Sequence, residues 1–183
     1  MSKLKEEYGE ERAKAIFESL LVRNKASIRV TDLSRKDEIQ ALLEASDSLL
    51  SVSGLVKEQG HFAGHDLFVE GAITIQDESS QLVAPTLDLQ GNEQVLDACA
   101  APGGKTAHIA SYLTTGQVTA LDLYDHKLDL IQENAQRLGV ADRVQRQKLD
   151  ARKVHEFFGQ NSFDKILVDA PCSGIGLLRR KPD

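Results

Sequence analysis

Short apolar runs alternate with segments of helical periodicity through the second half of the chain. The apolar runs have the length of buried strands, and the segments between them place apolar residues three and four positions apart. The predicted strands are Val95–Cys99, Val118–Leu123, Val144–Leu149 and Phe163–Asp169, and the predicted helices are Lys105–Leu113, His126–Leu138 and a short piece that ends at Phe158. Strands that alternate with helices form parallel sheets. The sequence therefore predicts an α/β fold, with a Rossmann-like doubly wound domain.

The first part of the chain has a different pattern, which indicates a small α+β subdomain. The predicted elements are helices at Glu10–Val22 and Arg35–Ala45 and strands at Ser27–Thr31, Leu49–Val56 and Phe68–Ile75. In the second helix we expect Ile39, Leu42 and Leu43 to point inward. We place the subdomain in residues 1–76 and the larger domain in residues 77–183, which opens with a helix that Asp77 caps and that runs to Leu87.

The run QVLDACAAPGGKT, residues 94–106, sets a glycine turn between a strand and a helix. Gly103 and Gly104 lack a Cβ, and the first backbone N–H groups of the helix point outward, so a ligand can approach closely. Further along the chain, Asp122 ends the second strand, where a carboxylate can hydrogen-bond a ribose diol. The spacing differs from that of the GxGxxG fingerprint and from a P-loop. We expect a nucleoside cofactor at this turn.

A second motif, DAPCSG at residues 169–174, follows the fourth strand. It places an acid, a rigid turn and a thiol at the sheet edge that carries the glycine turn. Cysteine adds readily to an electron-poor ring, and the carboxyl group of Asp169 could hydrogen-bond such a ring. Cys172 is therefore a candidate nucleophile, with a buried thiol in a structural turn as the alternative.

Composition narrows the choice of partners. A net charge of −6 excludes a uniformly basic surface, so contact with RNA would have to be local. Basic residues gather between Arg23 and Lys36, where they suit phosphate contacts or a solvated face equally. No apolar run is long enough to cross a membrane, and the charged N-terminus is not followed by a hydrophobic segment. We expect a cytoplasmic protein.

Metal binding and disulfide bonding are not expected. The spacing of His61 and His65 invites a metal site, but no cysteine or carboxylate cluster completes a ligand set. The two cysteines, Cys99 and Cys172, are far apart in sequence and lie in small-residue motifs, unlike a secreted disulfide framework.

Four segments together resemble the S-adenosylmethionine-dependent RNA cytosine-carbon-5 methyltransferases. The segments are IQDESSQLVAP at 75–85, DACAAPGGKT at 97–106, ALDLYDHKLDLIQENAQRLG at 120–139 and DAPCSGIGLLRRKPD at 169–183. The resemblance implies an S-adenosylmethionine site. Its residues would be Cys99, Ala100, Ala101, Pro102, Gly103, Gly104 and Lys105 around the methionine end, Asp122 on the ribose, Asp150 near the adenine, and Asp169 between the cofactor and the target base.

The resemblance also implies ribosomal RNA of the small subunit as the substrate and a mechanism with two cysteines. One cysteine, in a later Thr-Cys motif, adds to carbon 6 of cytosine, and the Pro-Cys thiol, here Cys172, helps to release the product. The sequence ends before a Thr-Cys motif and lacks a preceding helical RNA-binding region. We therefore expect it to be an excerpt that does not turn over by itself.

Three alternatives stay open at this point. Asp169-Ala170-Pro171 is faintly similar to the acidic loop of amino-nitrogen methyltransferases, although Cys172 stands where that loop has an aromatic residue. An NAD-dependent oxidoreductase would share the fold class, but the sequence lacks GxGxxG. The third alternative is a non-catalytic RNA-binding module with a vestigial nucleotide site.

Overall fold

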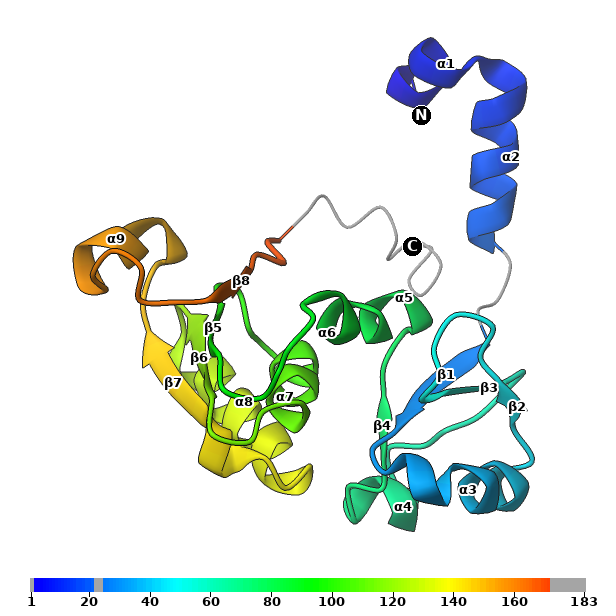
Figure 1. Ribbon diagram of the computed structural model, residues 1–183. Helices are drawn as coiled ribbons and strands as arrows, with labels where there is room; N and C mark the ends of the chain where they lie inside the picture. The colour runs from blue at the N-terminus through cyan, green and yellow to red at the C-terminus, as the bar shows by residue number, and fades with distance from the viewer. Residues whose placement is uncertain (1, 22–24, 172–183) are drawn as a thin grey trace. The chain divides into compact units, whose positions relative to one another are not determined.

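The computed structural model describes residues 2–21 and 25–171 of the chain. The candidate nucleophile Cys172 lies outside these residues. Two helices, α1 (Ser2–Tyr8) and α2 (Glu10–Leu21), belong to one unit, and Ala26–Ala170 form a second compact unit (Figure 1). The helix predicted at Glu10–Val22 is confirmed as α2, whereas the sequence pattern did not predict α1. Gly9, with a φ of +77°, separates the two helices.

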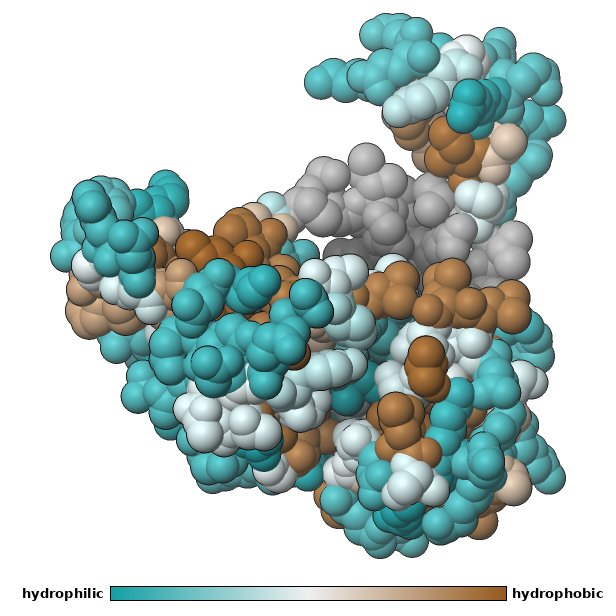
Figure 2. All heavy atoms as spheres, in the orientation of Figure 1, coloured by the Kyte–Doolittle hydropathy of each residue, from teal (hydrophilic) through white to brown (hydrophobic). Residues whose placement is uncertain are grey.

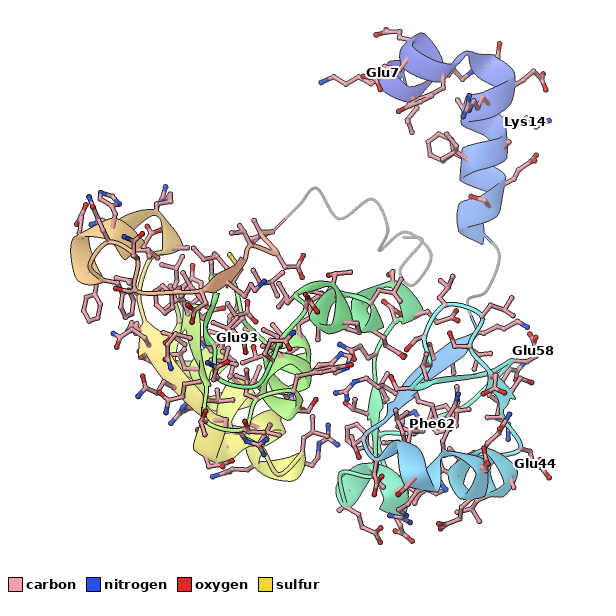
Figure 3. The ribbon with its side chains drawn as sticks, in the orientation of Figure 1. Glu7, Lys14, Glu44, Glu58, Phe62 and Glu93 are labelled. Atoms are coloured by element: carbon pink, nitrogen blue, oxygen red, sulfur yellow. The ribbon has the colours of Figure 1, made fainter. Side chains whose placement is uncertain are left out.

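A four-stranded sheet in the order β2-β3-β1-β4 forms the small subdomain, and its neighbouring strands pair antiparallel. The strands are β1 (Ala26–Val30), β2 (Ser46–Asp47), β3 (Gly54–Lys57) and β4 (Ile73–Ile75), and the helices are η1 (Leu33–Arg35), α3 (Lys36–Leu43) and α4 (Asp66–Val69). Ile39 and Leu43 of α3 and Leu67 of α4 pack in one core with Ile28 of the sheet. Phe62 lies in the same core (Figure 3).

Leu42 and Leu49 do not behave as predicted. Leu42 is 63% exposed, because the face of α3 that packs against the sheet carries Ile39 and Leu43, and Leu42 lies outside that face. Leu49 is 98% exposed and outside any strand. The hydroxyl of Ser48 accepts hydrogen bonds from the amides of Leu50 and Ser51 at 3.1 and 3.0 Å, so these donors go to a local turn and not to a sheet. The strand therefore begins only at Gly54.

The strand predicted at Phe68–Ile75 is also shorter, because its first part is helical. Nδ1 of His65 accepts from the amide of Leu67 at 3.2 Å and caps α4, which includes Phe68. The chain then turns at Gly71, with a φ of +79°, before β4 begins at Ile73. The cap by His65 thus stabilises a helix in a segment whose alternating apolar pattern predicts a strand.

Two short helices, α5 (Glu78–Gln81) and α6 (Val83–Thr86), connect the two sheets, where the periodicity predicts one helix. Pro85 has no amide hydrogen to give to the carbonyl of Gln81, which favours the break. The side-chain nitrogen Nε2 of Gln81 donates to Ser27 Oγ at 3.2 Å and to the carbonyl oxygens of Ile28 and Gln76 at 3.2 and 2.9 Å. Gln81 therefore fastens α5 to the small sheet.

The larger sheet is parallel and has the strand order β7-β6-β5-β8. The strands are β5 (Gln94–Asp97), β6 (Gln117–Asp122), β7 (Val144–Lys148) and β8 (Lys165–Leu167). In order of appearance this is 3-2-1-4, the arrangement of a doubly wound sheet, in which ligands bind beyond the carboxyl ends of the strands. The predicted Rossmann-like α/β fold is confirmed, and the largest difference is at β8, which spans only Lys165–Leu167 of the predicted Phe163–Asp169.

Helices α7 (Gly104–Ser111) and α8 (Asp125–Arg137) supply most of the helical part of the core of this domain. Ile109 and Ile131 pack with Val95 and Val118 of the central strands. The smaller elements are η2 (Ala141–Arg143), η3 (Ala151–Lys153) and α9 (Val154–Phe157). Ile166 is 56% exposed, and Figure 2 shows hydrophobic atoms around β8. The core thus fixes β5 and β6 most firmly, and these are the strands that carry the glycine turn and Asp122.

Candidate active site

The glycine turn after β5 is held by backbone hydrogen bonds to both neighbouring strands. The amide of Ala98 donates to Leu167 O at 2.9 Å, and the amide of Ala100 donates to Leu121 O at 2.9 Å. The Ala101–Pro102 peptide is cis, and the amide of Gly103 closes the turn on Ala100 O at 2.7 Å. The turn is therefore a fixed feature of the carboxyl edge of the sheet.

Gly103 and Gly104 have different structural duties. Gly103 has a φ of +100°, and a Cβ there would lie 2.9 Å from the Cα of Ile131, so a side chain would strain the backbone and collide with α8. Among the residues that the structure describes, a Cβ on Gly104 would meet only Gln76 Nε2, at 4.0 Å. Gly103 thus lets the turn pack against α8, whereas Gly104 leaves open space at the start of α7.

The start of α7 offers hydrogen-bond donors to a ligand. The first amides of any helix have no partner within the helix, and the N-cap residue here, Gly103, has no side chain with which to cap them. The positive end of the helix dipole points to the same place. A carboxylate or phosphate group would be stabilised there, in the space that Gly104 leaves open.

Asp97, which the sequence analysis missed, is buried directly beneath the turn. Its side chain is 1% exposed, and its Oδ2 accepts from the hydroxyl of Thr106 at 2.7 Å. Within residues 2–21 and 25–171, Oδ1 of Asp97 has no hydrogen-bond partner. Burial raises the pKa of Asp97, opposed by the hydrogen bond from Thr106. Its place as the first residue of DACAAPGGKT, at the end of a strand, is the signal that could have revealed it.

Asp122 lies at the carboxyl end of β6, as predicted. Its side chain is 10% exposed, its Oδ1 accepts from the amide of Tyr124 at 3.2 Å, and Lys127 Nζ lies 4.0 Å away. The carbonyl of Asp122 accepts from the amide of Leu149 at 3.2 Å, which brings the end of β7 alongside. Within the described part of the chain these contacts engage Oδ1, which leaves Oδ2 for a hydroxyl donor at the sheet edge.

Asp150 follows β7 and is held by Arg152. Both carboxylate oxygens accept from the guanidinium, at 2.5 to 3.1 Å, and Oδ1 also accepts from the amide of Arg152 at 3.0 Å. These hydrogen bonds lower the pKa of Asp150 from 3.8 to about 2. Asp150 is thus ionised at neutral pH and directed toward its own turn.

Asp169 and Lys105 meet at the same edge. Lys105 Nζ donates to Asp169 Oδ2 at 2.6 Å, and the two side chains are 25% and 54% exposed. The glycine turn and the segment after β8 are therefore linked by an ion pair. Pro171 is the last residue described in this segment, so the position of Cys172 is not part of the site geometry.

The thiol of Cys99 lies among three carboxylates. Burial raises its pKa, and the negative charges of Asp97, Asp122 and Asp169 raise it further. The thiol is therefore protonated at neutral pH and is not the thiolate that a nucleophile must be. The predicted site residues that the structure describes thus lie along one edge of the sheet, where Cys99 lines the turn.

The sequence profile of the family described as 16S rRNA methyltransferase RsmB/F matches residues 84–183. The chain belongs to this family. It is 45% identical over 184 residues to the probable ribosomal RNA small subunit methyltransferase B of Bacillus subtilis (strain 168), an alignment that covers 96% of this chain and 41% of that protein. The resemblance to a family of RNA methyltransferases, drawn from the motifs, is confirmed. The chain spans about two fifths of the length of this curated relative.

Two solved structures share the fold of this chain. A methyltransferase homologue from Pyrococcus horikoshii superposes with a TM-score of 0.78 at 31% identity, over 91% of this chain and 56% of that chain. NSun6 from Pyrococcus horikoshii, solved with SFG, superposes with a TM-score of 0.84 at 21% identity, over 93% and 69% of the two chains. The second likeness shows the shared fold.

Two further expectations concern metals and membranes. Among the described residues, no group of three His, Cys, Asp or Glu side chains is placed to hold a metal ion. His65, half of the histidine pair noted in the sequence, caps α4 through Nδ1. No helix in the described part of this family member is both long and apolar enough to cross a bilayer.

Proposed function

We propose that this chain carries the cofactor half of an S-adenosylmethionine-dependent methyltransferase that acts on carbon 5 of a cytosine in small-subunit ribosomal RNA. The observation that carries the proposal is the convergence of the glycine turn, Asp122 and Asp169 on one sheet edge, in a member of the RsmB/F family. We further propose that the protein works in the cytoplasm, because ribosomal RNA, the substrate class in the names of its relatives, would be found there.

The edge fits S-adenosylmethionine in its charges and its open space. The methionine carboxylate would accept from the free amides at the start of α7, beside Gly104, and the ammonium would face the unpartnered Oδ1 of Asp97. Asp122 would accept from the ribose hydroxyls. When bound, the cofactor supplies an electrophilic methyl group. The SFG in the NSun6 structure, an analogue of S-adenosylmethionine, is consistent with such a site on this fold.

The role proposed for Asp150 requires a local rearrangement. Arg152 engages both of its carboxylate oxygens, so an adenine amino group could reach Asp150 only if Arg152 released one of them. Arg152 is 87% exposed, and an exposed ion pair contributes little stability, so the release costs little. Asp150 would then accept from the base while its other oxygen kept the amide of Arg152.

The chemistry at the target explains why an acid and a thiol follow β8. Carbon 5 of cytosine becomes nucleophilic only after a thiolate adds to carbon 6, and the adduct collapses after methyl transfer, when a base removes the proton from carbon 5. Asp169 would hydrogen-bond the ring, and Lys105 would keep that carboxyl group in place. In the family pattern Cys172 assists the release of the product, and a second thiol forms the adduct.

The base must leave its stack to reach this edge, so we propose that the substrate is looped or single-stranded RNA. Arg29, in the basic stretch noted in the sequence, is 3% exposed and donates to Gln76 Oε1 at 2.8 Å, so it is not a phosphate contact. Exposed basic side chains such as Arg35 would serve instead.

The test is methyl transfer by the full-length protein to small-subunit ribosomal RNA, with analysis of the product nucleosides. The proposal expects 5-methylcytosine. An N-methylated cytosine would favour the amino-nitrogen alternative, and RNA binding without any transfer would favour a non-catalytic module. RNA that contains 5-fluorocytosine distinguishes the roles of the two thiols: a covalent adduct that persists in Cys172→Ala supports product release, and an adduct that disappears makes Cys172 the nucleophile.

A further inference from the structure

Helix α8 contacts the glycine turn through the side chain of Asn134 and through the backbone at Ile131. Asn134 donates from Nδ2 to the carbonyl oxygen of Pro102 at 2.8 Å. On the same side of the helix, Ile131 backs Gly103 so closely that a Cβ would not fit. The turn thus has a backbone support at Ile131 and a single polar support at Asn134.

The same helix also holds the small sheet. Arg137, one turn beyond Asn134, donates from Nη1 to Phe68 O at 2.8 Å and to Ile73 O at 3.2 Å. Its Nη2 donates to Thr74 Oγ1 at 3.2 Å, and the guanidinium lies 3.9 Å from the centre of the Phe68 ring. One arginine therefore fixes α4 and β4 to the end of α8.

Asn134 and Arg137 are joined to each other. Arg137 Nη2 donates to Asn134 Oδ1 at 3.1 Å, so both ends of the Asn134 amide are engaged. A continuous set of contacts runs from β4 through Arg137 and Asn134 to Pro102 in the cofactor turn. The approach is close along the backbone as well, because a Cβ on Gly71 would lie 2.1 Å from Arg137 O.

We propose that Asn134 and Arg137 are positioning residues that hold the turn at residues 100–104 in its binding shape and couple it to the small sheet. Neither side chain needs to touch the cofactor. Only the identity of the ligand rests on the function proposed above. The consequence is that a change in the small sheet, such as RNA docking on it, alters cofactor affinity through Arg137.

Asn134→Ala and Asn134→Asp separate the two bonds of the asparagine amide. Both variants lose the donor to Pro102, but Asn134→Asp keeps an acceptor for Arg137. In the full chain without ligand, both should raise the amide exchange rates of Ala100 and Gly103 by about tenfold, the loss of roughly one hydrogen bond. Amides of residues 68–74 should change in Asn134→Ala and stay protected in Asn134→Asp.

Arg137→Met tests the coupling. It should speed exchange in residues 68–74 and, more weakly, at Gly103, although Arg137 does not contact the turn directly. Gln136→Ala, at an exposed position of the same helix, is the matched control and should leave both regions as in wild type. Exchange at the turn that is the same in Asn134→Ala, Asn134→Asp and Gln136→Ala would overturn the proposal, and a response confined to residues 68–74 in Arg137→Met would overturn the coupling.

Titration with S-adenosylmethionine completes the test. The two Asn134 variants should bind about three- to tenfold more weakly than Gln136→Ala. If the wild-type chain bound no S-adenosylmethionine, the proposed function would fail, while the exchange data would still decide the roles of Asn134 and Arg137. If the wild type bound and the Asn134 variants bound equally well, the positioning role would be wrong.

Discussion

Lys105 and Asp169 form an ion pair at 2.6 Å that joins the glycine turn to the segment after β8. Because both side chains are partly exposed, the pair should add no more than about 1 kcal/mol to stability. Asp169→Asn should therefore melt within a few degrees of wild type. If this carboxyl group hydrogen-bonds the target base, the same change in the full-length protein should slow methyl transfer at least about a hundredfold.

The control for that prediction is Asp142→Asn, an exposed carboxylate that precedes β7 at the opposite edge of the sheet. It should leave both the melting temperature and the transfer rate unchanged. Equal rates for wild type and Asp169→Asn would remove Asp169 from the reaction.

The two glycines of the turn should respond differently to alanine. Gly103→Ala adds a Cβ at a positive φ and against Ile131, so it should cost about 1 to 3 kcal/mol of unfolding free energy. Gly104→Ala meets open space and should leave stability nearly unchanged, or slightly higher because alanine favours helices. If a ligand occupies that space, Gly104→Ala should still weaken cofactor binding. Urea unfolding and calorimetry on both variants give the comparison, and a stable Gly104→Ala with wild-type affinity would argue against the proposed site.

His108 should make stability depend on pH. It is 3% exposed, and burial together with the charge of Arg29 lowers its pKa from 6.5 to about 3. The unfolded chain takes up the proton near pH 6.5, while the folded protein keeps the ring neutral. The contribution of the neutral ring to the free energy of unfolding is therefore complete above pH 6.5 and is lost as the pH falls toward 3. When the pH is lowered from 7 to 5, the titration of His108 should reduce the free energy of unfolding of the wild type by about 2 kcal/mol.

His108→Gln removes that titration, so its unfolding free energy should fall less than that of wild type over the same range. His126→Gln, an exposed histidine on α8, is the control for loss of a histidine. Parallel urea-unfolding profiles for wild type and His108→Gln from pH 7 to 5 would show that the buried ring does not contribute.

Much of the larger domain could be predicted from sequence because its signals are local and repeated. A buried strand, a glycine turn and a helix with Ile109 on its inner face follow one another within twenty residues, and Asp122 ends the next strand. The small subdomain was harder to predict. Hydrogen bonds that single side chains accept from backbone amides, Ser48 in one loop and His65 in another, decided where its strands begin.

The parts of the site that could not be predicted depend on contacts between distant segments. Lys105 and Asp169 were both candidates, but their pairing follows from the parallel alignment of β5 and β8. Asn134 was one polar residue among several on an amphipathic helix, and nothing in its local sequence indicates a bond to Pro102. Buried Asp97 was missed because an acid at a strand end is usually an exposed cap.

The central claim is that the turn at residues 99–105 and Asp122 bind S-adenosylmethionine, and calorimetry on this 183-residue chain tests it most directly. The account predicts that the chain binds S-adenosylmethionine and not NAD. Asp122→Ala should bind about ten- to a hundredfold more weakly, since a hydrogen bond to a charged acceptor is lost, and Asp142→Ala should bind as wild type does. Binding that is unchanged in Asp122→Ala, or a preference for NAD, would contradict the account.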